Sequence, residues 1–449
     1  MGIRTASTLL IALFACACGD DVDPPQPSPP DTGAADAGVV ADAEVADAWS
    51  PFDVSLGPDA SALEDAAPVD VGPDVESPLR VEVTIDVEDF AHFYEDPEDR
   101  DFEPEVSVEF EGDEYDDVQM EVHGGYARRF PKLSFRFRFD NDEPLSTDAF
   151  SGDEMEEHRR VVMQASWVDP TYSRNCLTFE LIRAEGGLAP RCNHAELYVN
   201  GEYHGFYVLL ERVDEVFLER NGLNPDGLLL KAENHSANWA DKERFMDGMA
   251  VKGNEDADTA PYAELLEALS GTPLEYEAFQ EEVASRLNLG DWMLWQGVHT
   301  LADNRDTFTK NYYLYRDPDL PFSRFRIISW DADATWGMNW DGMLVEPTTM
   351  AINGHDPFSR RILRIEEYRT TYLETYALRV EALTSQESAV LARLDEQHAF
   401  LEPFIDRDLE EWDRGLNSAD LHEALRTTVQ TRYEIMAEVV FTEQETEEP

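Results

Sequence analysis

Several short stretches of the chain alternate between apolar and polar residues, which is the spacing of a strand with one buried face. The clearest is 133–139, where a leucine and three phenylalanines occupy every second position. Shorter runs of the same kind cover 81–85 and 106–110. We predict a strand at each of these three places.

The following part of the chain predicts a helix and then a hairpin. Apolar residues recur at helical spacing after Asp169 and stop at the pair Gly186–Gly187, a typical helix end. The pair Asn200–Gly201 then separates two apolar runs, and this dipeptide is the strongest short signal for a hairpin. A short helix is predicted over 215–220, directly after the hairpin.

Two acidic loops interrupt the second half of the chain. Apolar residues at helical spacing begin at Asp291, which we predict as the N-cap, and lead into the loop 303–306. Two predicted strands, 312–315 and 325–329, connect this loop to a second one at 330–333. The pattern is therefore helix, acidic loop, hairpin, acidic loop.

The N-terminal part differs in composition from the rest. Residues 1–18 have the layout of a cleaved export signal, and their apolar run ends at Cys16 and Cys18, either of which can accept a lipid anchor. Simple secretion is the alternative. The segment 19–78 has no Lys or Arg and few large apolar residues, so it cannot offset the entropy of ordering. We predict a disordered acidic tether.

The charge of the chain excludes one class of partner. The 95 acidic residues face 35 basic ones, which gives a net charge of -60. Such a charge repels nucleic acid and anionic lipid. We therefore expect no nucleic-acid role, and contact with a membrane only through the lipid anchor.

Beyond the export signal the sequence contains two cysteines, Cys176 and Cys192. An even pair in an exported chain predicts a disulfide, and two buried free thiols are the alternative. A zinc site would need more ligands than these two thiols supply.

The acidic loops carry groups suited to phosphoryl transfer. This reaction needs positive charge on the phosphates, a carboxylate near the attacking hydroxyl, and ligands for magnesium. Asp306 and Asn311 are separated by the interval found between the base and the metal-binding Asn of kinases, and Asp331 and Asp333 follow in the second loop. That interval alone also fits a solvated loop. The order of elements around it favours a nucleotide site.

A glycine-rich and basic cluster precedes the strand 133–139. Gly124 and Gly125 would let backbone N–H groups approach phosphates, while Arg129 and Lys132 would supply positive charge. The alternative for Lys132 is a surface residue that offsets neighbouring acids. No Walker A motif is present.

The chain resembles the CotH (spore coat protein H) kinase family over roughly residues 80 to 415. The matching segments are His123–Tyr126 with Lys132–Arg136, Leu197–Tyr207, Glu211–Asp214, Asn311–Tyr315, and Trp330–Asp333 with Gly337. The resemblance implies an atypical protein-kinase fold that uses ATP with a divalent metal and phosphorylates secreted proteins on serine.

The resemblance also implies roles for single residues. Lys132 would pair with phosphate, Asp306 would be the catalytic carboxylate, and Asn311 would bind metal. The metal would be anchored by the second acidic loop, through Asp331, Asp333 or both.

Other positions are less specific. Glu211 stands where a kinase hinge would meet adenine, and a salt bridge with the neighbours of Arg212 is the alternative. Glu180 or Glu185 could pair with the lysine, as a kinase helix Glu does. Lys231 falls on a family landmark without a role. The family often carries Trp beside the catalytic Asp, but Thr307–Phe308 stands here, which leaves the substrate side of the site open.

We therefore expect an α+β, bilobal, atypical kinase-like domain over 79–440, followed by an acidic tail, 441–449. The small lobe, 79–230, would hold a mixed or antiparallel sheet, and the large lobe, 231–440, would be mainly helical. The expected cofactors are ATP and Mg²⁺ or Mn²⁺. The expected partner is a secreted or surface protein, phosphorylated on serine by a monomer at the bacterial cell envelope or in secreted form.

Two other functions compete with the kinase. A catalytically silent pseudokinase, kept as a surface binding module, is favoured by the scarcity of ATP outside the cytoplasm, whereas the complete set of carboxylates and Asn311 favours the enzyme. A calcium-stabilised adhesin ranks last, because the sequence has no Asp-x-Asp-x-Asp-Gly loop.

Overall fold

The computed structural model describes residues 77–150, 154–239, 242–320, 322–346 and 357–445. The predicted export signal, with Cys16 and Cys18, and nearly all of the predicted tether lie outside the described residues.

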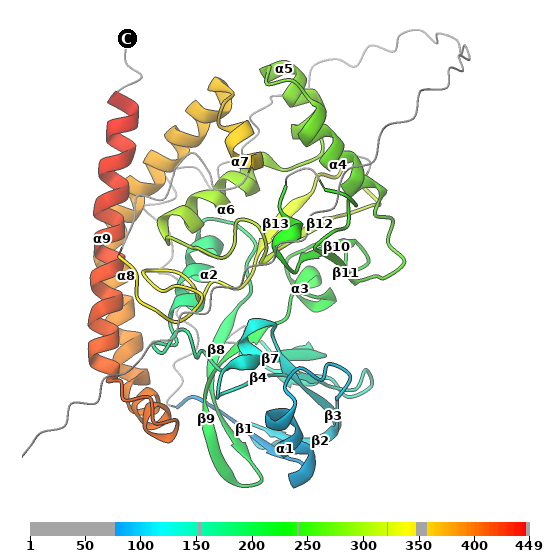
Figure 1. The fold of residues 1–449 in the computed structure, drawn as a ribbon, viewed down its shortest axis with the longest axis vertical. Helices are drawn as coiled ribbons and strands as arrows, with labels where there is room; N and C mark the ends of the chain where they lie inside the picture. Colours follow the sequence, from blue (N-terminus) through cyan, green and yellow to red (C-terminus); the bar gives the residue numbers. More distant parts are fainter. Residues whose placement is uncertain (1–76, 151–153, 240–241, 321, 347–356, 446–449) are drawn as a thin grey trace, which may run out of the picture. The chain divides into compact units, whose positions relative to one another are not determined.

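Seven strands form a closed barrel in the order β1-β2-β3-β4-β7-β9-β8 (Figure 1). They are β1 Leu79–Thr84, β2 Glu105–Phe110, β3 Asp113–His123, β4 Ser134–Arg138, β7 Arg160–Gln164, β8 Cys192–Val199 and β9 Glu202–Glu211. Neighbouring strands are antiparallel except for β1 and β8, which are parallel and close the barrel. The predicted mixed sheet is therefore present.

The alternating sequence pattern fills the barrel. Phe135 and Phe137 of β4 are fully buried in the same cluster as Val81 and Val83 of β1. The hairpin between β8 and β9 turns at Asn200 and Gly201, which both have positive φ, +53° and +85°. This pair of left-handed residues is the geometry that makes Asn-Gly a hairpin signal.

A second, four-stranded sheet has the order β11-β10-β12-β13. Its strands are β10 Leu228–Ala232, β11 Met249–Gly253, β12 Tyr312–Arg316 and β13 Arg326–Ser329. Helix α6 (Leu289–Leu301) packs on β13 and on helix α2 (Arg174–Ala184).

The N-cap of α6 is Asn288, so the prediction of Asp291 was wrong. The Asn288 Oδ1 accepts a hydrogen bond from the backbone N–H of Asp291, 3.2 Å away. Asp291 instead forms an ion pair with Arg326 of β13, with its Oδ2 2.6 Å from the arginine Nε. The carboxylate thus ties the first turn of α6 to the neighbouring strand.

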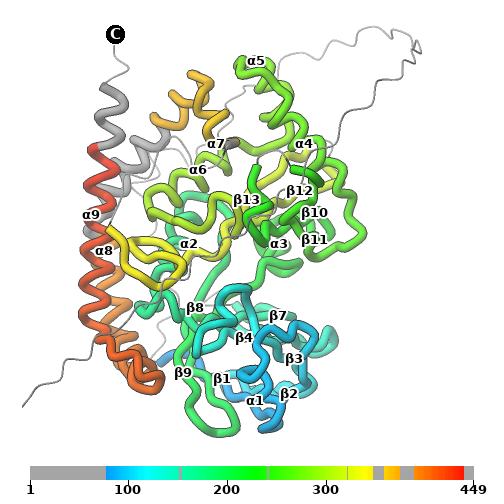
Figure 2. The backbone as a smooth tube through the Cα atoms, viewed as in Figure 1, coloured from blue at the N-terminus to red at the C-terminus, as the bar shows by residue number. Residues whose placement is uncertain are grey.

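Helices dominate the C-terminal part. The two long ones, α8 (Glu366–Glu411) and α9 (Ser418–Glu445), lie side by side (Figure 2). The remaining elements are α1 Val87–Glu95, α3 Glu215–Arg220, α4 Ala260–Gly271, α5 Tyr276–Phe279, α7 Pro357–Ile362, β5 Leu145–Thr147, β6 Glu156–His158 and the single turns η2 Tyr126–Arg129, η3 His235–Ala237 and η4 Gln280–Ala284. The predicted α+β class is confirmed. No helix within the described ranges is long and apolar enough to cross a membrane.

The predicted disulfide is present. It joins Cys176 of α2 to Cys192, the first residue of β8, across a Cα–Cα distance of 5.8 Å. The bridge fixes the helix that supports the second acidic loop to the barrel.

Candidate functional site

The hairpin β12–β13 brings the two acidic loops together. Its register pairs Tyr312 with Ser329. Asn311 precedes the first strand and Asp331 follows the second by two residues, so both lie at the same end of the hairpin. Both have left-handed backbones, with φ of +60° and +56°. Such strained conformations in residues other than glycine concentrate at functional sites.

Asp306 is held by two neighbours of its own loop. Its Oδ2 lies 2.6 Å from the Lys310 Nζ and accepts a hydrogen bond from the Asn311 Nδ2 at 3.0 Å. The other polar atom of the Asn311 side chain, its Oδ1, has no partner among the described residues. The predicted catalytic carboxylate and the predicted metal-binding amide are therefore in direct contact.

The carboxylates of the two loops repel one another. Burial raises the pKa of Asp331, and the charge of Asp306 raises it further, while Lys310 and Lys231 lower it. Burial and then the charge of Asp331 raise the pKa of Asp333 well above its ordinary value. The three predicted acidic residues thus form one electrostatic group.

A chain of amides supports the second acidic loop. The Gln164 Nε2 of β7 donates to the Asp333 Oδ2 at 3.2 Å and its Oε1 accepts from the Asn175 Nδ2 of α2 at 2.5 Å. The Asn175 Oδ1 accepts from the backbone N–H of Ala332 at 2.6 Å. Asp333 thus has a side-chain donor, whereas the carboxylate of Asp331 has none among the residues described.

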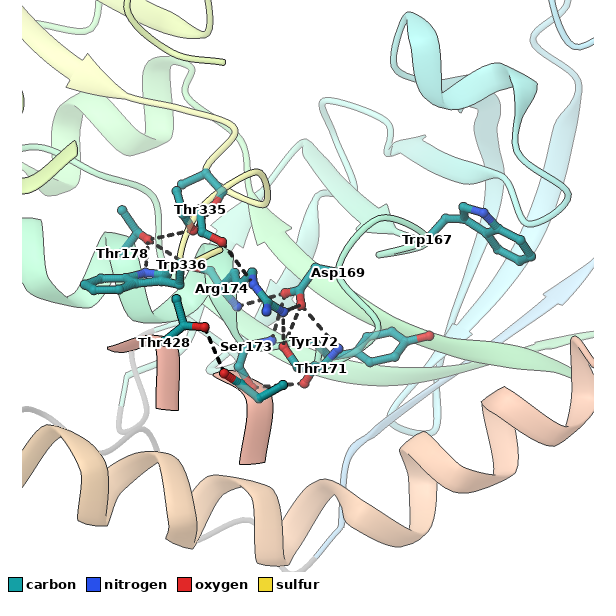
Figure 3. Close-up of polar contacts among 12 residues, drawn as sticks. Trp167, Asp169, Thr171, Tyr172, Ser173, Arg174, Thr178, Thr335, Trp336 and Thr428 are labelled. Carbon is teal, nitrogen blue, oxygen red and sulfur yellow. Dashed lines mark hydrogen bonds and ion pairs between the residues drawn. The ribbon is translucent and has the colours of Figure 1, made fainter. Parts of the chain in front are cut away.

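A buried network fixes the continuation of this loop on α2 (Figure 3). Arg174 forms an ion pair with Asp169 at 2.6 Å, and its Nε donates to the backbone carbonyl of Thr335 at 3.0 Å. The indole of Trp336 donates to the Thr178 Oγ1 at 3.0 Å. The sequence indicated only a helix start at Asp169. It did not predict this role, because Arg174 and Thr335 are far apart in the chain.

Lys132 lies in a different place. Its ammonium is 1% exposed, 2.6 Å from the Asp408 Oδ1 of α8 and 3.0 Å from the Tyr172 hydroxyl, and it also donates to the backbone carbonyl of Phe206. Burial lowers its pKa to about 8, against the charge of Asp408.

The acid that pairs with Lys132 is therefore Asp408, rather than either of the predicted alternatives, Glu180 and Glu185. Asp306, Asn311, Asp331 and Asp333 are not among the partners of Lys132. The role of Lys132 on phosphate stays a prediction.

The predicted glycine turn is held by its own arginine. Arg128 donates from its Nε to the backbone carbonyl of Gly124 at 2.8 Å and also to the backbone carbonyl of Val122. Gly124 has a left-handed backbone, with φ of +100°. Gly125 follows it, and Arg129 is mostly exposed and lies 3.9 Å from Glu98.

This turn approaches the segment that follows the second acidic loop. The ring of Tyr126 packs edge-on against that of Trp340, with centroids 5.2 Å apart. The structure therefore brings the glycine turn near the polypeptide downstream of Asp333. The contact of Gly124, Gly125 and Arg129 with phosphate stays a prediction.

Glu211 is fully buried in a salt bridge. Its Oε1 accepts from the Arg220 Nε at 2.9 Å, and its Oε2 accepts from the backbone N–H of Arg191 at 2.9 Å. Glu211 therefore forms a salt bridge, as the alternative held, and its partner is Arg220 of α3. A contact between this position and adenine stays a prediction.

Positive charge does occur beside the acidic loops, on Lys231 and Arg212. Lys231 pairs with Tyr313 in the register of β10 and β12, and its Nζ lies 5.4 Å from the ring centroid of Trp330. Its pKa is lowered to about 7 by burial first and then by the charge of Arg212, while Asp331 raises it. His123, at the end of β3, has its pKa lowered by burial and by the charges of both cations.

The donor groups fit a hard divalent cation. Within the described parts of the chain, no three Asp, Glu, His or Cys residues converge as a complete metal site. Magnesium, however, usually takes one or two carboxylates and completes its shell with water and substrate phosphates. The raised pKa values of Asp331 and Asp333 indicate a site that a cation would relieve of repulsion. Both carboxylates and the free Oδ1 of Asn311 suit Mg²⁺ or Mn²⁺.

Comparison with known proteins agrees with the segments noted above. The family model described as "CotH kinase protein" matches residues 120–436. The inner spore coat protein H of Bacillus subtilis (strain 168) is 26% identical over 311 aligned residues, and the alignment covers 66% of this chain and 82% of that protein. The match of the family model includes both acidic loops, Lys132, Arg212 and Lys231.

Proposed function

The chain belongs to the CotH kinase protein family, and from this premise we propose that it is an atypical protein kinase that transfers the γ-phosphoryl group of ATP to serine. The observation that carries the proposal is that Asp306, Asn311, Asp331 and Asp333 lie in the two loops at one end of the hairpin β12–β13. These groups are the carboxylate and the metal ligands that phosphoryl transfer requires.

Each acidic residue has a distinct part in the proposed reaction. The serine oxygen bonds to the γ-phosphorus of ATP, and Asp306 accepts the proton of that hydroxyl. The bond between the γ-phosphorus and the bridging oxygen breaks at the same time, and ADP leaves. Lys310 and Asn311 fix the orientation of this carboxylate. Asp331, Asp333 and the Asn311 Oδ1 would hold Mg²⁺ or Mn²⁺, which neutralises charge on the phosphate oxygens.

The bilobal architecture is part of the proposal. The barrel would supply most of the small lobe, and the sheet β11-β10-β12-β13 with its helices would supply the large lobe. The acidic loops belong to the latter, as the catalytic and metal-binding loops of protein kinases do. The amide chain from Gln164 to Asp333 supports a functional link between the two parts.

The setting proposed for this activity is outside the cytoplasm. Residues 1–18 would direct export, and Cys16 or Cys18 would carry a lipid. The substrate would be a secreted or surface protein, and the kinase would act as a monomer. The disulfide between Cys176 and Cys192 is in keeping with an oxidising compartment.

A silent binding module of the same fold is the second candidate. The observation that favours it is the burial of Lys132 against Asp408, which leaves the predicted phosphate-pairing lysine occupied. The carboxylates favour the enzyme, in contrast. Their mutual repulsion costs stability, and a module that binds no nucleotide would gain no function from it.

Phosphoryl transfer from labelled ATP tests the proposal. The purified chain should label itself or a general acceptor protein with Mg²⁺ or Mn²⁺, and a chelator should abolish the labelling. Asp331→Asn should be inactive, whereas Asp256→Asn, which changes an exposed carboxylate in the loop after β11, should match the wild type. No labelling by the wild type with either metal would favour the binding module.

A further inference from the structure

Arg212 is a buried cation that forms no ion pair with another residue of the described chain. It follows β9 directly and is 8% exposed. Its Nη1 is buried and has no hydrogen-bond partner among the described residues. Asp214 is close enough for the charge of Arg212 to lower its pKa, but the two residues form no ion pair. A buried charge without a partner costs several kcal/mol, so such groups are rare in folded proteins unless a ligand completes them.

Two further donors, Tyr313 and Lys231, lie close enough to Arg212 for its charge to lower their pKa values. The hydroxyl of Tyr313 on β12 is fully buried and also has no hydrogen-bond partner among the described residues. Lys231 pairs with Tyr313 in the register of β10 and β12, is partly buried, and forms no ion pair with another described residue. Its Nζ lies 5.7 and 5.4 Å from the ring centroids of Tyr313 and Trp330. All three groups can donate a hydrogen bond, so the missing partner is an acceptor with negative charge.

The surroundings indicate what kind of anion this is. Lys231 is close enough to Asp331 for each to shift the pKa of the other, so the anion would lie next to the acidic loops. A carboxylate ligand there would be repelled by Asp331 and Asp333. A phosphate can contact a metal ion on one side and protein cations on the other, as nucleotide phosphates do in kinases.

We propose that Arg212, Lys231 and Tyr313 form a phosphate-binding subsite that holds a non-transferred phosphate of the nucleotide. This inference rests on the proposed kinase function, because the acidic loops supply the metal on the other side of the phosphate. Arg212 and Lys231 would supply the positive charge that the sequence predicted at Lys132. Asp331 and Glu233 act on Lys231, and Asp214 interacts with Arg212, but neither cation forms an ion pair with a described carboxylate. Lys132, by contrast, already contacts Asp408.

Calorimetric titration of the full chain with ATP, adenosine and inorganic pyrophosphate, each with Mg²⁺, tests the subsite. Arg212→Met and Lys231→Met should weaken the binding of ATP and pyrophosphate by at least about tenfold, because each removes a charge-assisted hydrogen bond. The affinity for adenosine should not change. Tyr313→Phe, which removes a single hydroxyl, should show a smaller loss in the same direction.

Lys252→Met is the matched control. Lys252 lies on β11, beside β10, and is paired with Glu233 at 2.8 Å, so this variant should bind all three ligands as the wild type does. Thermal melting without ligand provides a second readout. Arg212→Met should melt at the same or a higher temperature, because it removes a buried unpaired charge.

The possible results separate this inference from the proposed function. Equal ATP affinity in the wild type, Arg212→Met and Lys231→Met would overturn the subsite and leave the kinase standing. Pyrophosphate binding that depends on both residues, in a chain that transfers no phosphate from ATP, would support the subsite and contradict the kinase. A wild type that binds none of the three ligands contradicts both. An Arg212→Met protein that melts earlier and loses all ligands equally would make Arg212 structural and overturn the subsite.

Discussion

Single carboxylates in this protein differ in the partners that the fold gives them. Asp306 receives two hydrogen bonds, from Lys310 and Asn311, and Asp333 receives one, from Gln164. Asp331 receives none from the described side chains. The sequence could not separate Asp331 from Asp333, because both stand in the same four-residue loop. The difference in hydrogen bonding makes Asp331 the one more available to a metal.

At the residue scale, Asp214 should make stability depend on pH. This residue caps α3 by accepting from the Val216 N–H at 3.2 Å, and burial, followed by the charge of Glu215, raises its pKa to about 7. A carboxyl with a raised pKa stabilises the fold while protonated and loses that contribution as pH rises through the folded pKa.

Asp214→Asn should therefore gain stability relative to the wild type between about pH 4 and pH 7, by roughly 4 kcal/mol at most. Asparagine keeps the cap but does not titrate. Urea unfolding at several pH values measures the difference. Asp86→Asn, which makes the same substitution at the exposed N-cap of α1, is the matched control for the change of a capping carboxylate. If the free energy of unfolding of Asp214→Asn and of the wild type changed equally with pH, the raised pKa of Asp214 would be contradicted.

Among the elements, α8 is the one whose position no local pattern could predict. The strands 81–85, 106–110 and 133–139 and the hairpin turn at Asn200–Gly201 were predicted nearly as observed, because their burial follows from alternation within a few residues. The contact between Lys132 and Asp408 joins residues 276 positions apart. No local sequence pattern around Lys132 or Asp408 indicates that the two residues meet. The sequence therefore predicted a phosphate contact for Lys132, whereas the structure places it in a buried ion pair with α8.

This ion pair should matter for stability. Lys132→Met leaves the carboxylate of Asp408 buried without its cation, which should cost about 3 to 5 kcal/mol of unfolding free energy. The double variant Lys132→Met, Asp408→Leu should regain part of that loss, since no charge remains buried. Urea unfolding measures both.

The same variants also separate the structural role from the predicted nucleotide role. If Lys132 contacted phosphate, Lys132→Met would keep the stability of the wild type and lose affinity for ATP. That pair of results would contradict the assignment of this lysine to the contact between α8 and the barrel.

At the scale of the whole molecule, the export signal, the disulfide and part of the candidate site could be predicted from the sequence. The layout of residues 1–18 predicted an exported chain, and the cysteine pair in such a chain predicted a disulfide, which is present. Asp306, Asn311, Asp331 and Asp333 were predicted because the order helix, acidic loop, hairpin, acidic loop places both loops at the same end of the hairpin. Arg212 and Tyr313 were missed, since the unpaired state of their polar atoms exists only in the folded chain.

Loss of the disulfide should lower the stability of the whole domain. Cys176→Ser combined with Cys192→Ser removes the crosslink, which closes a loop across a sequence separation of 16 residues. The expected cost is about 3 kcal/mol from the lost constraint on the unfolded chain. Thermal or urea unfolding of the double variant beside the oxidised wild type measures it. Mass mapping under non-reducing conditions that found both thiols free would remove the basis for this expectation.

The most direct test of the kinase assignment is whether Asp306→Asn separates nucleotide binding from turnover. If Asp306 accepts the hydroxyl proton, the variant should bind ATP with Mg²⁺ as the wild type does. Its turnover should fall about a hundred- to ten-thousand-fold, a barrier increase of roughly 3 to 5 kcal/mol. Asp331→Asn should instead lose metal and nucleotide together. Equal phosphoryl-transfer rates in the wild type and Asp306→Asn would contradict the central role given to this carboxylate.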